Sequence, residues 1–82
     1  MRLDKFLKVS QLIKRRSVAK EAADGNKIKV NDKDAKPSTT INEGDLIQIS
    51  YSAKKLIVRV LSVNEYTAKR DASSMYEVIS NE

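Results

Sequence analysis

The chain has 82 residues, and its 16 lysines and arginines outnumber its 11 aspartates and glutamates, giving a formal net charge of +5. This length predicts a single domain over residues 1–82 with a thin core, because a chain of this size buries only about 60% of its unfolded surface. The sequence has no cysteine and no histidine, which excludes disulfides, thiolate sites and the commonest zinc ligand and general base. We therefore expect no enzyme, no metal site and no other cofactor.

No segment has the composition of a membrane span or an export signal. A span needs roughly 20 consecutive apolar residues, whereas the longest apolar run here is Leu56-Ile57-Val58. Charged residues interrupt the apolar residues of positions 1–8, unlike the apolar region of a signal peptide. The sequence thus predicts a soluble, cytoplasmic protein without a membrane partner.

The first 25 residues are expected to form two short helices joined by a basic turn. The first helix has one apolar face at the spacing i, i+3, i+4, i+7, made by Leu3, Phe6, Leu7 and Ser10. A second helix is predicted over residues 18–23, because Ser17 can cap its first turn and Gly25 follows its end.

From residue 27 onward, the pattern changes to the alternation that is typical of strands. Strands are predicted at residues 27–30, 34–36, 46–49, 56–63 and 75–79. Asn31 and Asp32 tolerate positive φ and favour a tight hairpin, Gly44 suits a left-handed turn, and the polar residues 66–74 are expected to contain a helical turn. The predicted fold class is α+β, with two N-terminal helices packed on a small, mostly antiparallel β-sheet.

The basic residues are concentrated near the N-terminus. Residues 1–30 contain nine basic and three acidic residues, a net charge of +6, whereas residues 31–82 contain seven basic and eight acidic residues, a net charge of −1. A one-sided positive field attracts a polyanion, and the usual one is the phosphate backbone of a nucleic acid. A lysine-rich face that only serves solubility is the alternative.

Five short motifs follow one another in the first 50 residues: Arg2-Leu3-Asp4, Arg15-Arg16-Ser17-x-Ala19, Ile28-x-Val30-Asn31, Pro37-Ser38 and Gly44-Asp45-Leu46-Ile47. Together they resemble the RNA-binding domain first described in small-subunit ribosomal protein S-four. The short chain and its C-terminal Ala72-Ser73-Ser74-Met75-Tyr76 narrow the resemblance to the RqcP family of bacterial ribosome quality-control proteins. The core motif is expected over residues 1–50, followed by a strand extension over residues 51–82.

The resemblance implies a function and a set of partners. RqcP-like proteins bind a dissociated large ribosomal subunit that still carries peptidyl-tRNA, and they help RqcH to extend the stalled chain with a C-terminal alanine tail. The expected partners are therefore large-subunit rRNA, peptidyl-tRNA and an RqcH-like tailing factor, with the protein itself a monomer. Two alternatives stay open: an accessory domain of an RNA-modifying enzyme or tRNA synthetase, and a constitutive ribosomal protein.

Ten residues are expected to bind RNA once the family's positions are carried over: Arg2, Lys5, Lys8, Lys14, Arg15, Arg16, Ser17, Lys20, Lys27 and Lys29. Guanidinium groups can clamp phosphates with two hydrogen bonds, and the amides near Ser17 can bind a phosphate at the start of a helix. For Lys27 and Lys29, a solvated surface explains the sequence equally well.

Two other residue types are given structural interpretations. Asp4 is interpreted as a helix-start charge or as the ion-pair partner of a neighbouring arginine, because it has neither a base partner nor a metal cluster. Phe6 is predicted to lie in the core. Phe6, Tyr51, Tyr66 and Tyr76 are residue types that can stack on bases, with Tyr51 and Tyr76 expected half-buried at strand ends. Aromatic residues make up only 5% of the chain, too few for a platform that stacks several bases.

Overall fold

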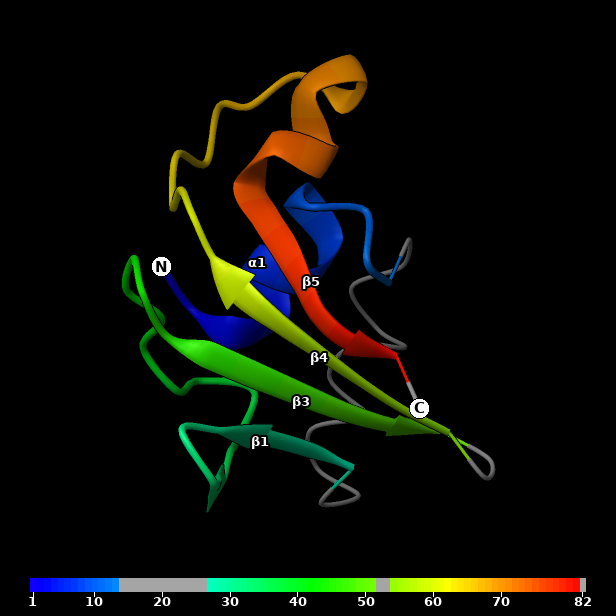
Figure 1. Ribbon diagram of the computed structural model, residues 1–82. Coiled ribbons are helices and arrows are strands. Elements are labelled where there is room, and N and C mark those ends of the chain that lie inside the picture. The colour runs from blue at the N-terminus through cyan, green and yellow to red at the C-terminus, as the bar shows by residue number, and fades with distance from the viewer. Residues whose placement is uncertain (14–26, 52–53, 82) are drawn as a thin grey trace.

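The computed structural model describes residues 1–13, 27–51 and 54–81. Its strands form one five-stranded sheet in the order β2-β1-β3-β4-β5, and every neighbouring pair is antiparallel. Figure 1 shows that α1 covers one face of this sheet. The elements in chain order are the α-helix α1 (Leu3–Val9), β1 (Ile28–Val30), β2 (Lys33–Asp34), β3 (Leu46–Tyr51), β4 (Lys54–Val60), the 3-10 helix η1 (Lys69–Met75) and β5 (Tyr76–Asn81).

The core lies between α1 and the sheet face that it covers. The predicted apolar face of the helix is confirmed, since Leu3, Phe6 and Leu7 are fully buried and Ser10 is nearly so. The sheet contributes buried side chains from alternating positions, namely Ile28, Val30, Ile47, Ile49, Val58 and Val60. This alternation follows from the strand geometry, which points successive side chains to opposite faces.

The start of α1 is held by backbone carbonyls of a distant segment. Arg2 occupies the N-cap position, but its guanidinium has no acceptor for the first helical amides. The amides of Leu3 and Asp4 instead donate to the carbonyls of Thr39 and Pro37, at 2.8 and 3.1 Å. These amides are therefore already satisfied, and the helix presents its side chains rather than its N-terminus to a ligand.

The two predicted tight turns are confirmed. Asn31 and Asp32 have φ values of 52° and 66° and separate the paired residues Val30 and Lys33, as in a two-residue hairpin of type I′. Gly44 has a φ of 90°, a conformation that a glycine adopts without steric cost. The side chain of Asn31 also holds the start of β3, because its Oδ1 accepts a hydrogen bond from the backbone N–H of Leu46 at 3.0 Å.

The predicted fold class is wrong in its balance of helix and sheet. In place of two N-terminal helices packed on a small, mostly antiparallel sheet, the described part of the chain has a wholly antiparallel five-stranded sheet with one short α-helix. Residues 18–23, where the second helix was predicted, lie outside the described residues.

All five strands were predicted, but the two edge strands have other bounds than the predicted 34–36 and 75–79. Both residues of β2 are exposed, and in β5 the apolar Val78 and Ile79 are 54% and 45% exposed. These segments are strands because their backbones pair with β1 and β4, rather than because they bury an apolar side. A pattern of burial therefore gives little signal for where they begin and end.

The helical turn predicted within residues 66–74 is present as η1. Its two buried side chains are Ala72 and Met75, a spacing of three that matches the three residues per turn of a 3-10 helix. Beside this turn, the predicted strand 56–63 ends at Val60, because the amides of Leu61 and Ser62 both donate to the Met75 carbonyl. Within the described ranges, no helix has the length and apolar character needed to cross a membrane.

Candidate nucleic-acid interface

Arg2 is oriented by the buried carboxylate of Asp4. Arg2 Nε lies 3.2 Å from Asp4 Oδ1, and Arg2 Nη2 lies 3.3 Å from Oδ2. The side chain of Asp4 is 3% exposed, whereas that of Arg2 is 54% exposed. The carboxylate thus holds the guanidinium by two donors, and the exposed part of the fork is available for a phosphate. The interpretation of Asp4 as an ion-pair partner is confirmed.

Lys5 is bound to the loop that follows β4. Its Nζ lies 2.9 Å from Glu65 Oε2, across 60 positions of sequence, and both side chains are partly exposed. The hydrogen bond from Lys5 and its positive charge lower the pKa of Glu65 below its ordinary value of 4.5. Lys5 therefore ties α1 to this loop, and a phosphate would have to compete with Glu65 for its charge.

The effect of Lys5 on Glu65 should be measurable by titrating the Glu65 carboxyl. Because the pKa of Glu65 is lowered in the folded protein, the stability that the pair contributes is complete above the unfolded pKa and is lost as the pH falls through the lower folded pKa. In an NMR titration, we expect the Glu65 carboxyl to have its midpoint below 4.5, and Lys5→Ala to raise that midpoint. Lys55→Ala, on β4, is the control. A midpoint that is unchanged by Lys5→Ala would contradict the pair.

Lys8 is exposed and lines a hollow of about 280 Å³ between the end of α1 and the residues before η1. The other residues that line it are Val9, Gln11, Glu65, Thr67 and Lys69. Lys69 was not among the residues predicted to bind RNA. Sequence alone gives no signal for it, because it comes near Lys8 only through the packing of the loop on α1.

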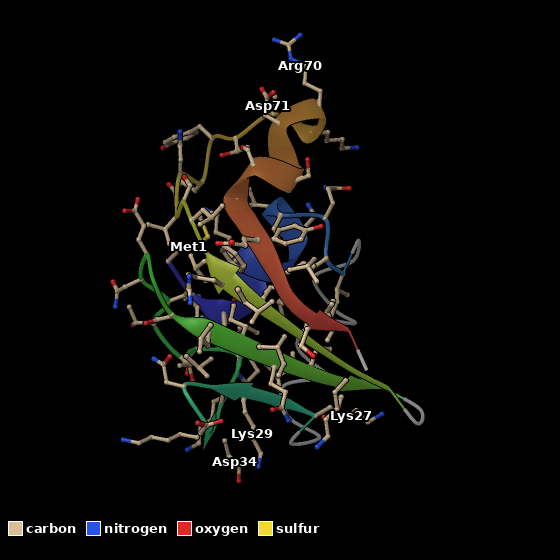
Figure 2. All side chains as sticks on the ribbon, viewed as in Figure 1. Met1, Lys27, Lys29, Asp34, Arg70 and Asp71 are labelled. Atoms are coloured by element: carbon tan, nitrogen blue, oxygen red, sulfur yellow. The ribbon has the colours of Figure 1, made fainter. Side chains whose placement is uncertain are left out.

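Lys27 and Lys29 lie apart from the α1 side chains. Lys29 is exposed between the buried Ile28 and Val30, so it points to the sheet face opposite α1. It is also paired in register with Asp34 on β2. Figure 2 shows Lys27, Lys29 and Asp34 at one end of the molecule and Arg70 at the other.

The structure therefore groups Lys5 and Lys8 on α1, beside Arg2 at its start, and does not join the two strand lysines to them. The remaining predicted RNA-binding residues lie outside the described residues: Lys14, Arg15, Arg16, Ser17 and Lys20. Among the described residues, no group of three His, Cys, Asp or Glu side chains is placed to hold a metal ion.

Comparisons with known proteins extend these observations. Residues 1–47 match the S4 domain. The RQC P-site tRNA stabilizing factor of Streptococcus pneumoniae is 54% identical over 98% of this chain and 91% of its own. That of Bacillus subtilis is 44% identical over 100% of this chain and 95% of its own. The solved structure of trimeric Vibrio cholerae Heat Shock Protein 15 is similar to this chain with a TM-score of 0.87 at 25% identity, covering 98% of this chain and 82% of that one.

The fold and the basic N-terminal segment thus define an RNA-binding protein built on an S4 domain. The matched residues 1–47 contain α1, β1, β2 and the start of β3, and residues 1–30 carry the whole basic excess. An identity of 44–54% to the two RQC P-site tRNA stabilizing factors, along nearly the full length of both chains, then identifies the family within this class. The chain belongs to the family of RQC P-site tRNA stabilizing factors, the RqcP family, so the predicted resemblance is confirmed.

Proposed function

We propose that the protein stabilises tRNA in the P-site of stalled, dissociated large ribosomal subunits, by contacting large-subunit rRNA and peptidyl-tRNA. The observation that carries this proposal is the similarity to RQC P-site tRNA stabilizing factors from four bacteria, at 44–54% identity over 98–100% of this chain. The basic excess in residues 1–30 supports it, because neutralising phosphates supplies much of the affinity of a protein for a nucleic acid.

The proposed mechanism is binding, without covalent chemistry by this chain. Arg2 is oriented by Asp4 before any ligand arrives, so less conformational entropy is lost when it meets a phosphate. Lys8 adds an exposed charge on the same helix, and the predicted basic residues at positions 14–20 would extend the contact. Such contacts fix the position of a structured RNA through its backbone and shape.

The proposed partner on the subunit is an RqcH-like factor that adds the C-terminal alanine tail. A peptidyl-tRNA that is held in the P-site stays available for each successive alanine, so holding it supports the tailing reaction. We propose that the protein acts in the cytoplasm and that it is a monomer. Sedimentation equilibrium of the purified chain tests the monomer, since the Vibrio cholerae relative is described as trimeric.

Co-sedimentation from cells tests the proposed function. The tagged full chain should be recovered with free large subunits, and sequencing of the bound RNA should find rRNA of the large subunit and tRNA. Cells without the protein should lose alanine tails on stalled nascent chains, and the intact gene should restore them. Even recovery across all intact ribosomes would contradict the proposal and would indicate a constitutive ribosomal protein.

Binding to the subunit should depend strongly on salt. If six to eight side chains contact phosphates, the slope of log K against log salt concentration should be roughly −4 to −7, at about 0.7–0.9 for each contact. The slope is measured by co-sedimentation with purified large subunits at several potassium chloride concentrations. A slope shallower than about −2 would show that the first 30 residues do not form the main binding face.

A further inference from the structure

The hollow at the end of α1 is lined by two lysines, and one of them, Lys69, has no part in the proposed function. Lys8 comes from α1 and Lys69 from the start of η1, and both line it. The single acidic residue in its wall, Glu65, is paired with Lys5 at 2.9 Å. The wall therefore carries two lysines, and its one acidic residue is already balanced by Lys5 from outside the wall, which suits an anionic ligand.

The loop beside the hollow is held in one conformation by its own hydrogen bonds. Asn64 Oδ1 accepts from the Tyr66 amide at 3.0 Å, and the Asn64 carbonyl accepts from Thr67 Oγ1 at 2.7 Å. The Thr67 amide donates to the same carbonyl at 3.2 Å. At the start of the loop, the Ser62 amide bonds the Met75 carbonyl, and Glu65 is tied to α1. This arrangement fixes where residues 64–67 point.

Tyr66 is presented by this turn with its side chain in solvent. At 86% exposure it is the most exposed large hydrophobic residue of the described ranges, well above Val78 at 54%. Leaving an aromatic ring uncovered gives up the free energy of burying it. Its chain neighbours Glu65 and Thr67 both line the hollow, so Tyr66 belongs to the loop that forms this wall while its own ring faces solvent.

We propose that this loop and the end of α1 form a second RNA-contact site, in which Lys8 and Lys69 bind one backbone phosphate and Tyr66 stacks on an unpaired base next to it. The inference rests on the proposed function, because it takes structured RNA as the ligand. A hollow of about 280 Å³ is large enough to admit a phosphate group together with its bound water. Unpaired bases in loops and bulges are what exposed aromatic side chains recognise in RNA.

RNA fits this site better than an acidic protein segment does, for two reasons. Lys8 belongs to the helix of the S4-matched segment, so the hollow continues the face that is proposed to bind RNA. An exposed aromatic ring on the loop that walls a lysine-lined hollow also offers both stacking and phosphate neutralisation, the combination used for unpaired nucleotides. Residues 65–69 lie beyond the S4 match, so the site gives the C-terminal extension a role in binding.

Exposed residues of the loop and η1 provide matched tests. Lys69→Ala should weaken binding about fivefold and reduce the salt slope by about 1. Arg70→Ala removes the same charge at the next position, but Arg70 is 88% exposed and faces Asp71 at 3.7 Å, and Figure 2 shows it projecting from the end of the molecule. It should change affinity by less than about twofold. Tyr66→Ala should weaken binding about fivefold to tenfold, whereas Tyr66→Phe keeps the ring and should bind like the original protein.

Two binding measurements distinguish a failure of this second site from a failure of the proposed function. The full-length variants are tested by co-sedimentation with purified large subunits that carry peptidyl-tRNA, and by fluorescence anisotropy with an RNA hairpin that has an unpaired loop. Melting temperatures should match that of the original protein. If the original protein binds subunits and Tyr66→Ala and Lys69→Ala bind equally well to both probes, the second site is wrong while the proposed function stands.

Other outcomes are equally decisive. If subunit binding is absent but hairpin binding depends on Tyr66 and Lys69, the second site stands and the proposed function fails. If Arg70→Ala weakens binding as much as Lys69→Ala, the effect is one of total charge, and the site is overturned. If the variants bind RNA normally but lose a co-purifying acidic protein, the loop is a protein-docking surface and the RNA site is wrong.

Discussion

Replacing Phe6 by alanine is expected to lower the free energy of unfolding by about 3–5 kcal/mol. Phe6 is fully buried on the inner face of α1, where truncation removes buried apolar surface and leaves a cavity. Native proteins have roughly 0.05–0.15 kcal/mol of stability per residue, or about 4–12 kcal/mol for a chain of this length. The change therefore removes a large share of the total. Urea unfolding followed by circular dichroism measures it.

Val78→Ala is the control for that experiment. Val78 is an apolar residue of β5, but its side chain is 54% exposed, so its truncation should change stability by less than about 0.5 kcal/mol. Equal losses from the two substitutions would mean that α1 does not close the core.

Phe6 also links stability to binding. The helix that it anchors carries Arg2 at its N-cap and Lys5 and Lys8 along its length. A variant in which α1 no longer docks should therefore lose RNA binding together with stability, in contrast to a change at an exposed charge. Substitutions in the core and at the surface thus separate the two properties.

Local features of the fold were predictable from the sequence because short-range chemistry determines them. The apolar face of α1 follows from the spacing of Leu3, Phe6 and Leu7, all of which are fully buried. The hairpin follows from Asn31 and Asp32, whose residue types tolerate the positive φ values that the turn requires. In each case, the signal lies within a few residues of the feature.

The exact bounds of the edge strands were not predictable in the same way. β5 pairs with β4 through its backbone, with a register irregularity at Ile57 and Val58, and backbone pairing leaves little trace in the side chains of an exposed edge strand. The support of α1 by the carbonyls of Pro37 and Thr39 also depends on packing between segments far apart in the chain. Such contacts between distant segments determine where the strands begin and end and how α1 is held on the sheet.

In the candidate site, too, contacts between sequence neighbours were predictable and contacts between distant segments were not. Arg2 and Asp4 are two residues apart, and their ion pair was anticipated from the sequence. The pairing of Lys5 with Glu65 spans 60 positions and was not anticipated, and it brings Lys69 and Tyr66 into the region of the α1 lysines. Lys29 is the opposite case: its charge belongs to the basic segment of the sequence, but its side chain faces the other side of the sheet, and its contact with RNA stays a prediction.

Replacing Arg16 by alanine is expected to weaken association with large ribosomal subunits by about tenfold to a hundredfold while the domain stays folded. Arg16 lies in a polar stretch between Arg15 and Ser17, outside the described residues. An exposed charge without a packing role usually changes stability by less than about 0.5 kcal/mol. A charge-assisted hydrogen bond to a phosphate contributes about 1.5–3 kcal/mol, and each factor of ten in affinity corresponds to roughly 1.4 kcal/mol.

Arg59→Ala is the matched control, since it removes the same side chain from a strand outside the basic segment. Arg59 is exposed on β4, lies across from Glu77 on β5 and is 3.9 Å from its carboxylate, so its charge is already partly balanced within the protein. Both variants are measured by co-sedimentation with large subunits, with melting temperatures recorded alongside. If Arg59→Ala weakens binding more than Arg16→Ala, the binding face lies on the sheet rather than in the N-terminal segment. If Arg16→Ala unfolds the protein, Arg16 has a structural role and its assignment to RNA binding is wrong.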